Sequence, residues 1–299
     1  MISMIIDTDI GPDCDDVGAM GVALNFIREK KIDLLAVTCC NSLKYAPLLV
    51  KTIFDTFGIQ DLPIGYLKSK KLFEDHLVYN KSIVEQFCKN TNMEFEDATW
   101  VLRKALYESK EKVTLVTIGT FTNISNLIDS KATEEIPLTG LELIEQKVEK
   151  LISMAGTFSL DFDEFNIQQD VQAAKNVMLE FPKKIIFQGF EVGNQVFTGE
   201  PLITENLEGP IKKSYEYYLK HVGTKARESW DLTTVYYAAN LDSPYFRLNE
   251  NGTILLDEIG KTSFDPIMDS NHGYVQLSDG KAKELEDELN AILLKIHHQ

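Results

Sequence analysis

Short runs of apolar, often β-branched residues alternate with longer amphipathic segments, and this alternation limits the folds open to the chain. The runs at residues 2–7, 32–38, 113–118, 151–155 and 184–188 read as buried strands. The longer segments at residues 15–30, 46–57, 99–109, 170–179, 230–239 and 281–296 read as helices. This rhythm predicts an α/β fold with a mostly parallel central sheet and helices on both faces. Ligands of such sheets bind beyond the carboxyl ends of the strands.

The length of the chain and the lack of an evident boundary predict a single domain covering residues 1–299. It contains no internal repeat and no Pro- or Gly-rich linker, and its 44% hydrophobic content is enough to build a core. Residues 67–96 have a weaker pattern with several aromatic side chains, which suggests an irregular segment such as a lid.

The charge balance restricts the partners. Against 46 Asp and Glu stand 30 Lys and Arg, a net charge of -16, which disfavours binding to nucleic acid or to an anionic membrane surface. A small neutral molecule or a cation suits this field better. There is no run of 18 apolar residues, no secretory signal pattern and no C-x-x-C pair among the four cysteines, so we expect a cytoplasmic protein with reduced thiols.

Five aspartates fall within ten residues at the end of the first predicted strand: Asp7, Asp9, Asp13, Asp15 and Asp16. A helix N-terminus favours acidic side chains, and this accounts for one or two of them. The others repel one another unless a cation lies among them. Carboxylate oxygens are the ligands of hard divalent ions, so the cluster predicts a cation site.

Two known types of carboxylate site can be compared with this cluster. An EF-hand loop starting at Asp7 would need Gly and Glu where the chain has Pro12 and Gly18, so that interpretation fails. A phosphatase of the haloacid dehalogenase type also follows its first strand with D-x-D, Asp7 being the nucleophile and Asp9 the acid–base group. This alternative leaves the pair Asp15-Asp16 unexplained.

The whole pattern resembles the inosine-uridine nucleoside hydrolase family. Strand, D-x-D-x-G and then D-D-x-x-A match the start of that family, and four further segments match in order along nearly the whole chain. They are residues 38–41 (TCCN), 118–123 (IGTFTN), 164–167 (EFNI) and 230–231 (WD). The resemblance implies the Rossmann-like nucleoside hydrolase fold and hydrolysis of the bond between ribose and nucleobase in a small nucleoside substrate.

The resemblance also implies a Ca²⁺ cofactor. By analogy with the family, the ligands are the carboxylates of Asp9, Asp16 and Asp231 and the backbone carbonyl of Ile118. Asp9 would also be the base that activates a calcium-bound water. Such a base is needed because calcium lowers the pKa of bound water only weakly.

Further residues are implied to bind the substrate. Asp15, Asn41, Glu164 and Asn166 would contact the ribose, while Asp7 would support the loop from behind. Taken singly, each has a structural explanation: Asn41 as a turn residue, Glu164 and Asn166 as an exposed loop, and Asp231 as a helix cap. We interpret the side chain of Thr120 as a helix N-cap.

Three departures from the family pattern bear on specificity. Trp230 stands where pyrimidine-cleaving members carry His. In this respect the chain is closer to the purine-preferring members, in which an indole ring stacks on the base. The candidates for a second stacking aromatic are Phe73, His76 and Tyr79. The longer loop leaves Asp13 without a role. No Asn before Glu164 matches the residue used near the ribose 5′-hydroxyl.

Besides the ribohydrolase, two interpretations stay open at this stage. One is the phosphatase described above, and the other is a calcium- or nucleoside-binding relative that has lost turnover. Relatives are often homodimers or homotetramers, so either assembly is an expectation for this chain.

Overall fold

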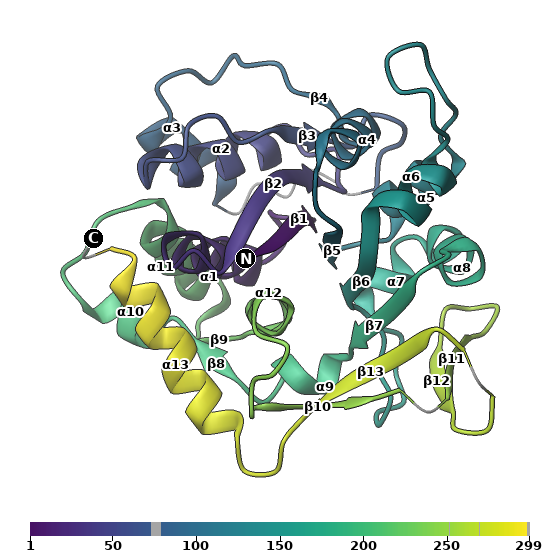
Figure 1. Cartoon of the computed structure of the whole chain (residues 1–299). Helices are drawn as coiled ribbons and strands as arrows, with labels where there is room; N and C mark the ends of the chain where they lie inside the picture. Colours follow the sequence, from purple (N-terminus) through teal and green to yellow (C-terminus); the bar gives the residue numbers. More distant parts are fainter. Residues whose placement is uncertain (73–78, 251, 269, 298–299) are drawn as a thin grey trace.

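The central element is a nine-stranded sheet in the order β10-β13-β7-β6-β5-β1-β2-β3-β4 (Figure 1). The computed structural model describes residues 1–72, 79–250, 252–268 and 270–297. The strands are β1 (Ile2–Thr8), β2 (Ile32–Cys39), β3 (Ile64–Tyr66), β4 (Glu96–Asp97), β5 (Val113–Ile118), β6 (Val148–Met154), β7 (Lys184–Gln188), β10 (Phe246–Asn249) and β13 (His272–Leu277). All pairs are parallel except β10 with β13. The predicted fold class is therefore confirmed.

Strand β1 is buried on both faces, which is why it reads as a continuous apolar run rather than an alternation. Met4 and Ile6 belong to one core cluster and Ile5 to the other, because successive side chains point to opposite faces.

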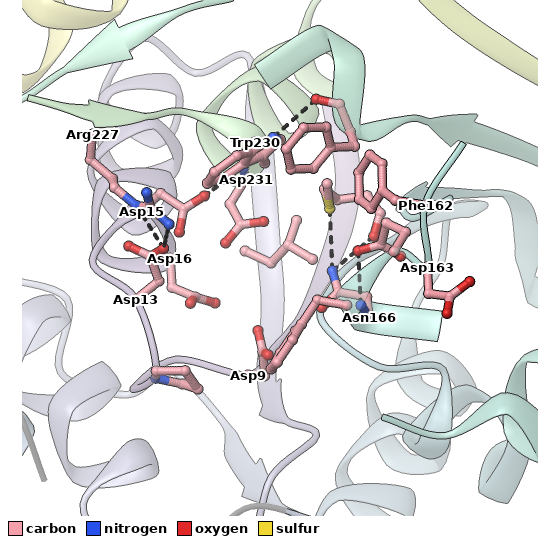
Figure 2. Close-up of a pocket in the computed structure, with 16 residues that line it drawn as sticks. Asp9, Asp13, Asp15, Asp16, Phe162, Asp163, Asn166, Arg227, Trp230 and Asp231 are labelled. Atoms are coloured by element: carbon pink, nitrogen blue, oxygen red, sulfur yellow. Dashed lines mark hydrogen bonds and ion pairs between the residues drawn. The ribbon is translucent and has the colours of Figure 1, made fainter. Parts of the chain in front are cut away.

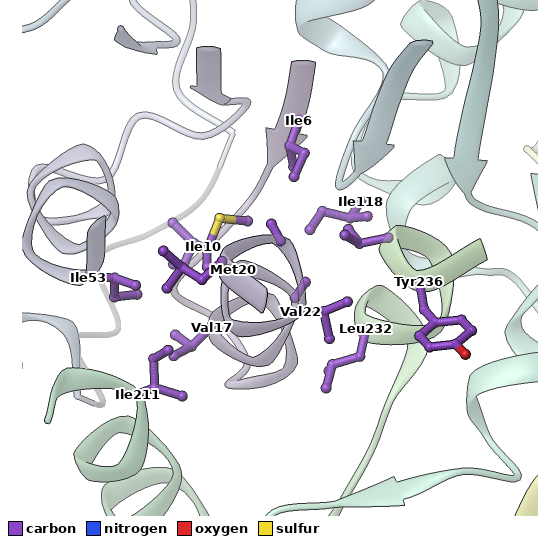
Figure 3. Close-up of a cluster of buried hydrophobic side chains, with 14 of the residues drawn as sticks. Ile6, Ile10, Val17, Met20, Val22, Ile53, Ile118, Ile211, Leu232 and Tyr236 are labelled. Atoms are coloured by element: carbon purple, nitrogen blue, oxygen red, sulfur yellow. The ribbon is translucent and has the colours of Figure 1, made fainter. Parts of the chain in front are cut away.

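Helices cover both faces (Figure 1). One face carries α1 (Asp15–Arg28), α2 (Ala46–Thr56), α3 (Asn80–Phe87), α11 (Pro210–Val222), α12 (Trp230–Ala239) and α13 (Ala282–Lys295). The other carries α4 (Ala98–Glu108), α5 (Thr122–Asp129), α6 (Gly140–Lys147) and α8 (Val171–Glu180). Helix α1 lies in the middle of the first face, with Ile53 of α2 on one side and Leu232 of α12 on the other (Figure 3). The packing of α1 against α12 brings together two segments about 200 residues apart in sequence.

Shorter elements complete the chain: α7 (Phe165–Gln168), α9 (Phe190–Gly193), α10 (Glu200–Thr204), the strand pair β8 (Phe197–Thr198) and β9 (Arg227–Glu228), and the pair β11 (Thr253–Leu256) and β12 (Thr262–Asp265). No helix in the described part of the chain is both long and apolar enough to cross a membrane.

All five predicted strands and six predicted helices are present, with ends displaced by up to three residues. Helix α1 ends at Arg28 rather than residue 30 because Lys30 has the left-handed φ of 56°. Several elements were missed, among them the short strands β3 and β4 at one end of the sheet, β10 and β13 at the other end, and the helices α3, α6 and α11.

Candidate active site

A cavity of about 380 Å³ lies beyond the carboxyl ends of β1, β5 and β6. That volume suits a small molecule, and the position is the one predicted for a parallel sheet. The register places Thr8 beside Ile118, so the residues after β1 and β5 meet at this edge. At Gly119 the backbones are so close that a β-carbon would lie 2.8 Å from the Asp9 nitrogen.

One wall of the cavity consists of carboxylates from two helix N-termini. Asp15 and Asp16 are in the first turn of α1, and Asp231 is in the first turn of α12. Each offers an oxygen within 4.8 Å of the others, although all three are at most 5% exposed. The Asp231 backbone N–H donates to Asp15 Oδ2 at 3.2 Å. Figure 2 shows this group across the cavity from Asn166, Phe162 and Asp163.

Among the described residues, none of these three carboxylates forms an ion pair, although the charge of Arg227 partly offsets the repulsion at Asp15. Burial raises the pKa of Asp15, Asp16 and Asp231 well above the ordinary value, and repulsion from the neighbouring aspartates adds to the effect. The Thr8 hydroxyl donates to Asp16, but a hydroxyl carries no charge. A hard divalent cation with oxygen ligands fits this donor set.

Asp9 also lines the cavity but lies outside the group whose oxygens approach within 4.8 Å. Burial, followed by the nearby charge of Glu164, raises its pKa to about 7, despite a hydrogen bond that lowers it. Asp9 can therefore exchange a proton near neutral pH. The group assembled by the structure differs from the predicted ligand set in containing Asp15 and lacking Asp9.

Asn41 is not at the cavity, contrary to its predicted ribose contact. It is fully buried, and its amide donates to the Asp9 carbonyl at 2.6 Å and the Ile10 carbonyl at 3.3 Å. Its Oδ1 accepts from the Leu43 backbone N–H at 3.1 Å. Asn41 therefore fixes the loop that carries Asp9, and its side chain is buried behind the cavity lining.

Asp7 lies behind the cavity, buried among side-chain donors. It accepts hydrogen bonds from Thr38 Oγ1 at 2.5 Å, Asn123 Nδ2 at 2.7 Å and Thr117 Oγ1 at 3.5 Å. This position suits a support for the strand end and is wrong for the phosphatase nucleophile. The N-cap expectation for Thr120 is wrong, because its hydroxyl bonds to that of Thr122 at 3.0 Å and the cap residue of α5 is Phe121.

The opposite wall is built by the start of α7. Glu164 caps this helix, accepting from the backbone N–H groups of Asn166 at 2.8 Å and Ile167 at 3.2 Å, and also from Gly156 at 3.0 Å. Burial nevertheless raises the pKa of Glu164 to about 7. Asn166 donates to the Met154 carbonyl at 3.0 Å, which leaves its oxygen side available. Both residues line the cavity, where the sequence places them.

Trp230 lines the third side together with residues that sequence reasoning missed. Its indole N–H donates to the Phe190 carbonyl at 3.0 Å, and its ring lies 5.1 Å from the Phe190 ring. The guanidinium of Arg227 lies 4.8 Å from the indole ring and pairs with Asp13. The one hint in the sequence was Asp13, an acidic residue to which the family pattern gives no role and which therefore needs another partner.

The proposed second stacking aromatic is not Tyr79. This residue is fully buried outside the cavity, where its hydroxyl donates to the Asp13 carbonyl at 2.5 Å and its ring packs edge-on against Tyr218 at 6.3 Å. Phe73 and His76 lie outside the described residues. The irregular region predicted at residues 67–96 contains the helix α3.

Comparison with known proteins identifies the family. Residues 4–272 match the model of the inosine-uridine preferring nucleoside hydrolase family. Among solved structures, an inosine-uridine preferring nucleoside hydrolase from Bacillus anthracis has a TM-score of 0.75 at 18% identity, with 99% of both chains covered. A plant nucleoside hydrolase has a TM-score of 0.72 at 18% identity, with 100% of this chain and 99% of the other covered.

A purine-preferring ribonucleoside hydrolase from Gardnerella vaginalis has a TM-score of 0.73 at 16% identity, with 99% of both chains covered. The curated protein sequences contain no match. These structural likenesses show the fold, and the match over residues 4–272 shows the family. The chain thus belongs to the inosine-uridine preferring nucleoside hydrolase family and is a nucleoside N-ribohydrolase.

Proposed function

We propose that this enzyme hydrolyses purine ribonucleosides to free base and ribose with the help of a bound calcium ion. The observation that carries the proposal is the convergence of Asp15, Asp16 and Asp231 from two helix N-termini onto one cavity. Three buried carboxylates within 4.8 Å are costly without a cation, and oxygen donors alone favour calcium or magnesium over softer metals.

Asp16 and Asp231 are the proposed ligands supported both by the family pattern and by the geometry. Asp15 joins them in the structure, and Ile118 lines the same cavity, where its carbonyl is a further candidate. When bound, the cation would supply a Lewis acid that orients water and the ribose hydroxyls.

Asp9 is the proposed general base. Its pKa near 7 suits a group that takes a proton from the attacking water at neutral pH. Asp15, Glu164 and Asn166 line the cavity and would exchange hydrogen bonds with the hydroxyls of a bound ribose. The negative charges of Asp15 and Glu164 would also favour the oxocarbenium-like transition state.

A purine preference is supported by the aromatic side of the cavity. Phe162, Phe190 and Trp230 form a broad apolar surface, and a purine has more ring area to bury than a pyrimidine. The same preference is named for the Gardnerella vaginalis relative.

The test is a nucleoside panel assayed for free base and ribose, with calcium or with EDTA. We expect inosine, adenosine and guanosine to be cleaved faster than uridine and cytidine, and all activity to fall in EDTA. Faster cleavage of pyrimidines would contradict the purine preference. Full activity after exhaustive chelation would contradict the cation.

A further inference from the structure

One cationic side chain lines the cavity in the described part of the protein, and neither the cation site nor the ribose site uses it. Arg227 in β9 stands three residues before Trp230 and four before Asp231. Figure 2 shows it at the end of the cavity occupied by Trp230, with Asn166 and Asp163 on the opposite side. Seven carboxylates share the cavity lining with it: Asp9, Asp13, Asp15, Asp16, Asp163, Glu164 and Asp231.

The guanidinium is held in a fixed position. Nε donates to Asp13 Oδ2 at 2.8 Å, Nη2 donates to the same oxygen, and Nη1 donates to Glu228 Oε2 at 2.8 Å. Its plane also lies near two rings, 4.8 Å from Trp230 and 5.6 Å from Tyr218. These bonds use three of the five N–H groups of an arginine, so two remain for a ligand within the described structure.

Arg227 keeps its charge under all conditions of interest. Burial lowers its pKa, but the hydrogen bonds and charge of Asp13 outweigh that effect, so the pKa stays above the ordinary value. Arg227 therefore cannot donate a proton to a leaving group as histidine does. It can donate hydrogen bonds and supply a permanent positive charge.

We propose that Arg227 binds the departing nucleobase and stabilises the negative charge that develops on it by donating hydrogen bonds, which rests on the proposed ribohydrolase function. The C1′–N bond breaks and its electron pair passes to the base nitrogen, while the water oxygen bonds to C1′ and one water proton passes to Asp9. The base then takes a proton from solvent, and Arg227 keeps all of its own. The preferred substrates are ribosides whose base presents hydrogen-bond acceptors, such as 6-oxopurines.

A phosphate group is a poorer occupant for this arginine. Asp13 and Glu228 already balance its charge, and the remaining carboxylates of the cavity repel an anionic ground state. A neutral base avoids this repulsion, because its negative charge appears only as the bond breaks. Interactions that strengthen only at that point are the ones that accelerate turnover.

The experiment compares two substrates that differ in leaving group. In the Arg227→Gln enzyme, kcat/KM for inosine should fall about 100-fold, the usual effect of losing one donor to a developing anion. For 4-nitrophenyl riboside, whose leaving group needs little help, the loss should be several times smaller. The Arg227→Lys enzyme keeps the charge without the planar fork and should fall between wild type and Arg227→Gln. Arg247→Gln, at an exposed ion pair with Asp279, is the matched control and should leave both rates unchanged.

Two further readouts separate a contact with the base from a structural role. Added guanidinium ion should restore inosine cleavage in an Arg227→Ala enzyme, and calorimetry should show weaker hypoxanthine binding by the variants than by wild type. Equal losses on both substrates, with no rescue and unchanged hypoxanthine affinity, would overturn the assignment while leaving the ribohydrolase function intact. Failure of the wild-type enzyme to cleave either riboside would refute the ribohydrolase function and this inference with it.

Discussion

The acidic groups of the cavity fall into two classes. Asp13 has its counter-charge built into the protein, because Arg227 lies against it and both side chains are about one-quarter exposed or less. Asp9, Asp15, Asp16 and Asp231 have no cationic side chain bonded to them among the described residues, although they are almost fully buried. In the first arrangement the charge of the carboxylate is balanced without a ligand. The second has electrostatic repulsion that a bound cation would relieve, so the stability and activity that depend on it should change strongly with calcium and with pH.

Removing Asp9 should give the largest effect. The Asp9→Ala enzyme should lose about 10²- to 10⁴-fold in kcat, the contribution of a general base, while its circular dichroism stays native. Asp55→Ala, which alters a partly exposed carboxylate on α2, should leave the rate unchanged. Near-normal turnover by Asp9→Ala would remove Asp9 from the chemistry.

The stability of the cation-free protein should depend on pH in an unusual direction. The pKa of Glu164 is about 7 in the folded protein and ordinarily 4.5, so the native state binds more protons between these values. Stability should therefore fall as pH rises from 5 to 7, by up to about 3 kcal/mol for this group. Urea unfolding in EDTA would show it, and Glu164→Gln should flatten the slope. A wild-type stability that increases with pH over this range would contradict the raised pKa of Glu164 in the folded, cation-free protein.

Calcium should stabilise the fold. A ligand bound only by the native state, at 100 times its Kd, adds about 2.7 kcal/mol to the free energy of unfolding. Thermal melts with calcium and with EDTA measure this difference, which should shrink in Asp16→Asn. Identical wild-type melts in the two buffers would count against a cation site.

Breaking the ion pair between Asp13 and Arg227 should have the smallest effect of the four, and it should appear in the free energy of unfolding. Asp13→Asn should cost about 1 kcal/mol of stability, as expected for a partly exposed ion pair. The cost should be the same with calcium and with EDTA, since this pair is complete by itself. A loss confined to the calcium-loaded protein would place Asp13 among the cation ligands and erase the distinction between the two classes.

The sequence predicts the local parts of this structure well. The apolar runs give the parallel strands, and the aspartates after β1 indicate a charged site at the sheet edge. Helix α11 was missed although Ile211, Tyr215 and Leu219, all buried, recur at helical spacing. Strand β10 was missed because it has only four residues and the two in the middle, Arg247 and Leu248, are exposed.

The long-range parts of the site depended on the family resemblance. Asp231 and Asp15 are 216 residues apart, and no local pattern says that α12 packs against α1. Arg227 was missed for the same reason, since its pairing with Asp13 is visible only once the chain is folded. Asn41 was misassigned because a buried amide that fixes a loop and one that binds a sugar look alike in sequence.

Calorimetric titration of EDTA-treated protein with calcium chloride tests the cation site most directly. We expect one calcium ion per chain in the wild-type protein and a large loss of affinity in Asp231→Asn, with native binding retained by Asp55→Asn. An absence of binding heat in wild type, or equal affinity in wild type and Asp231→Asn, would show that the carboxylates of α1 and α12 do not assemble around a calcium ion.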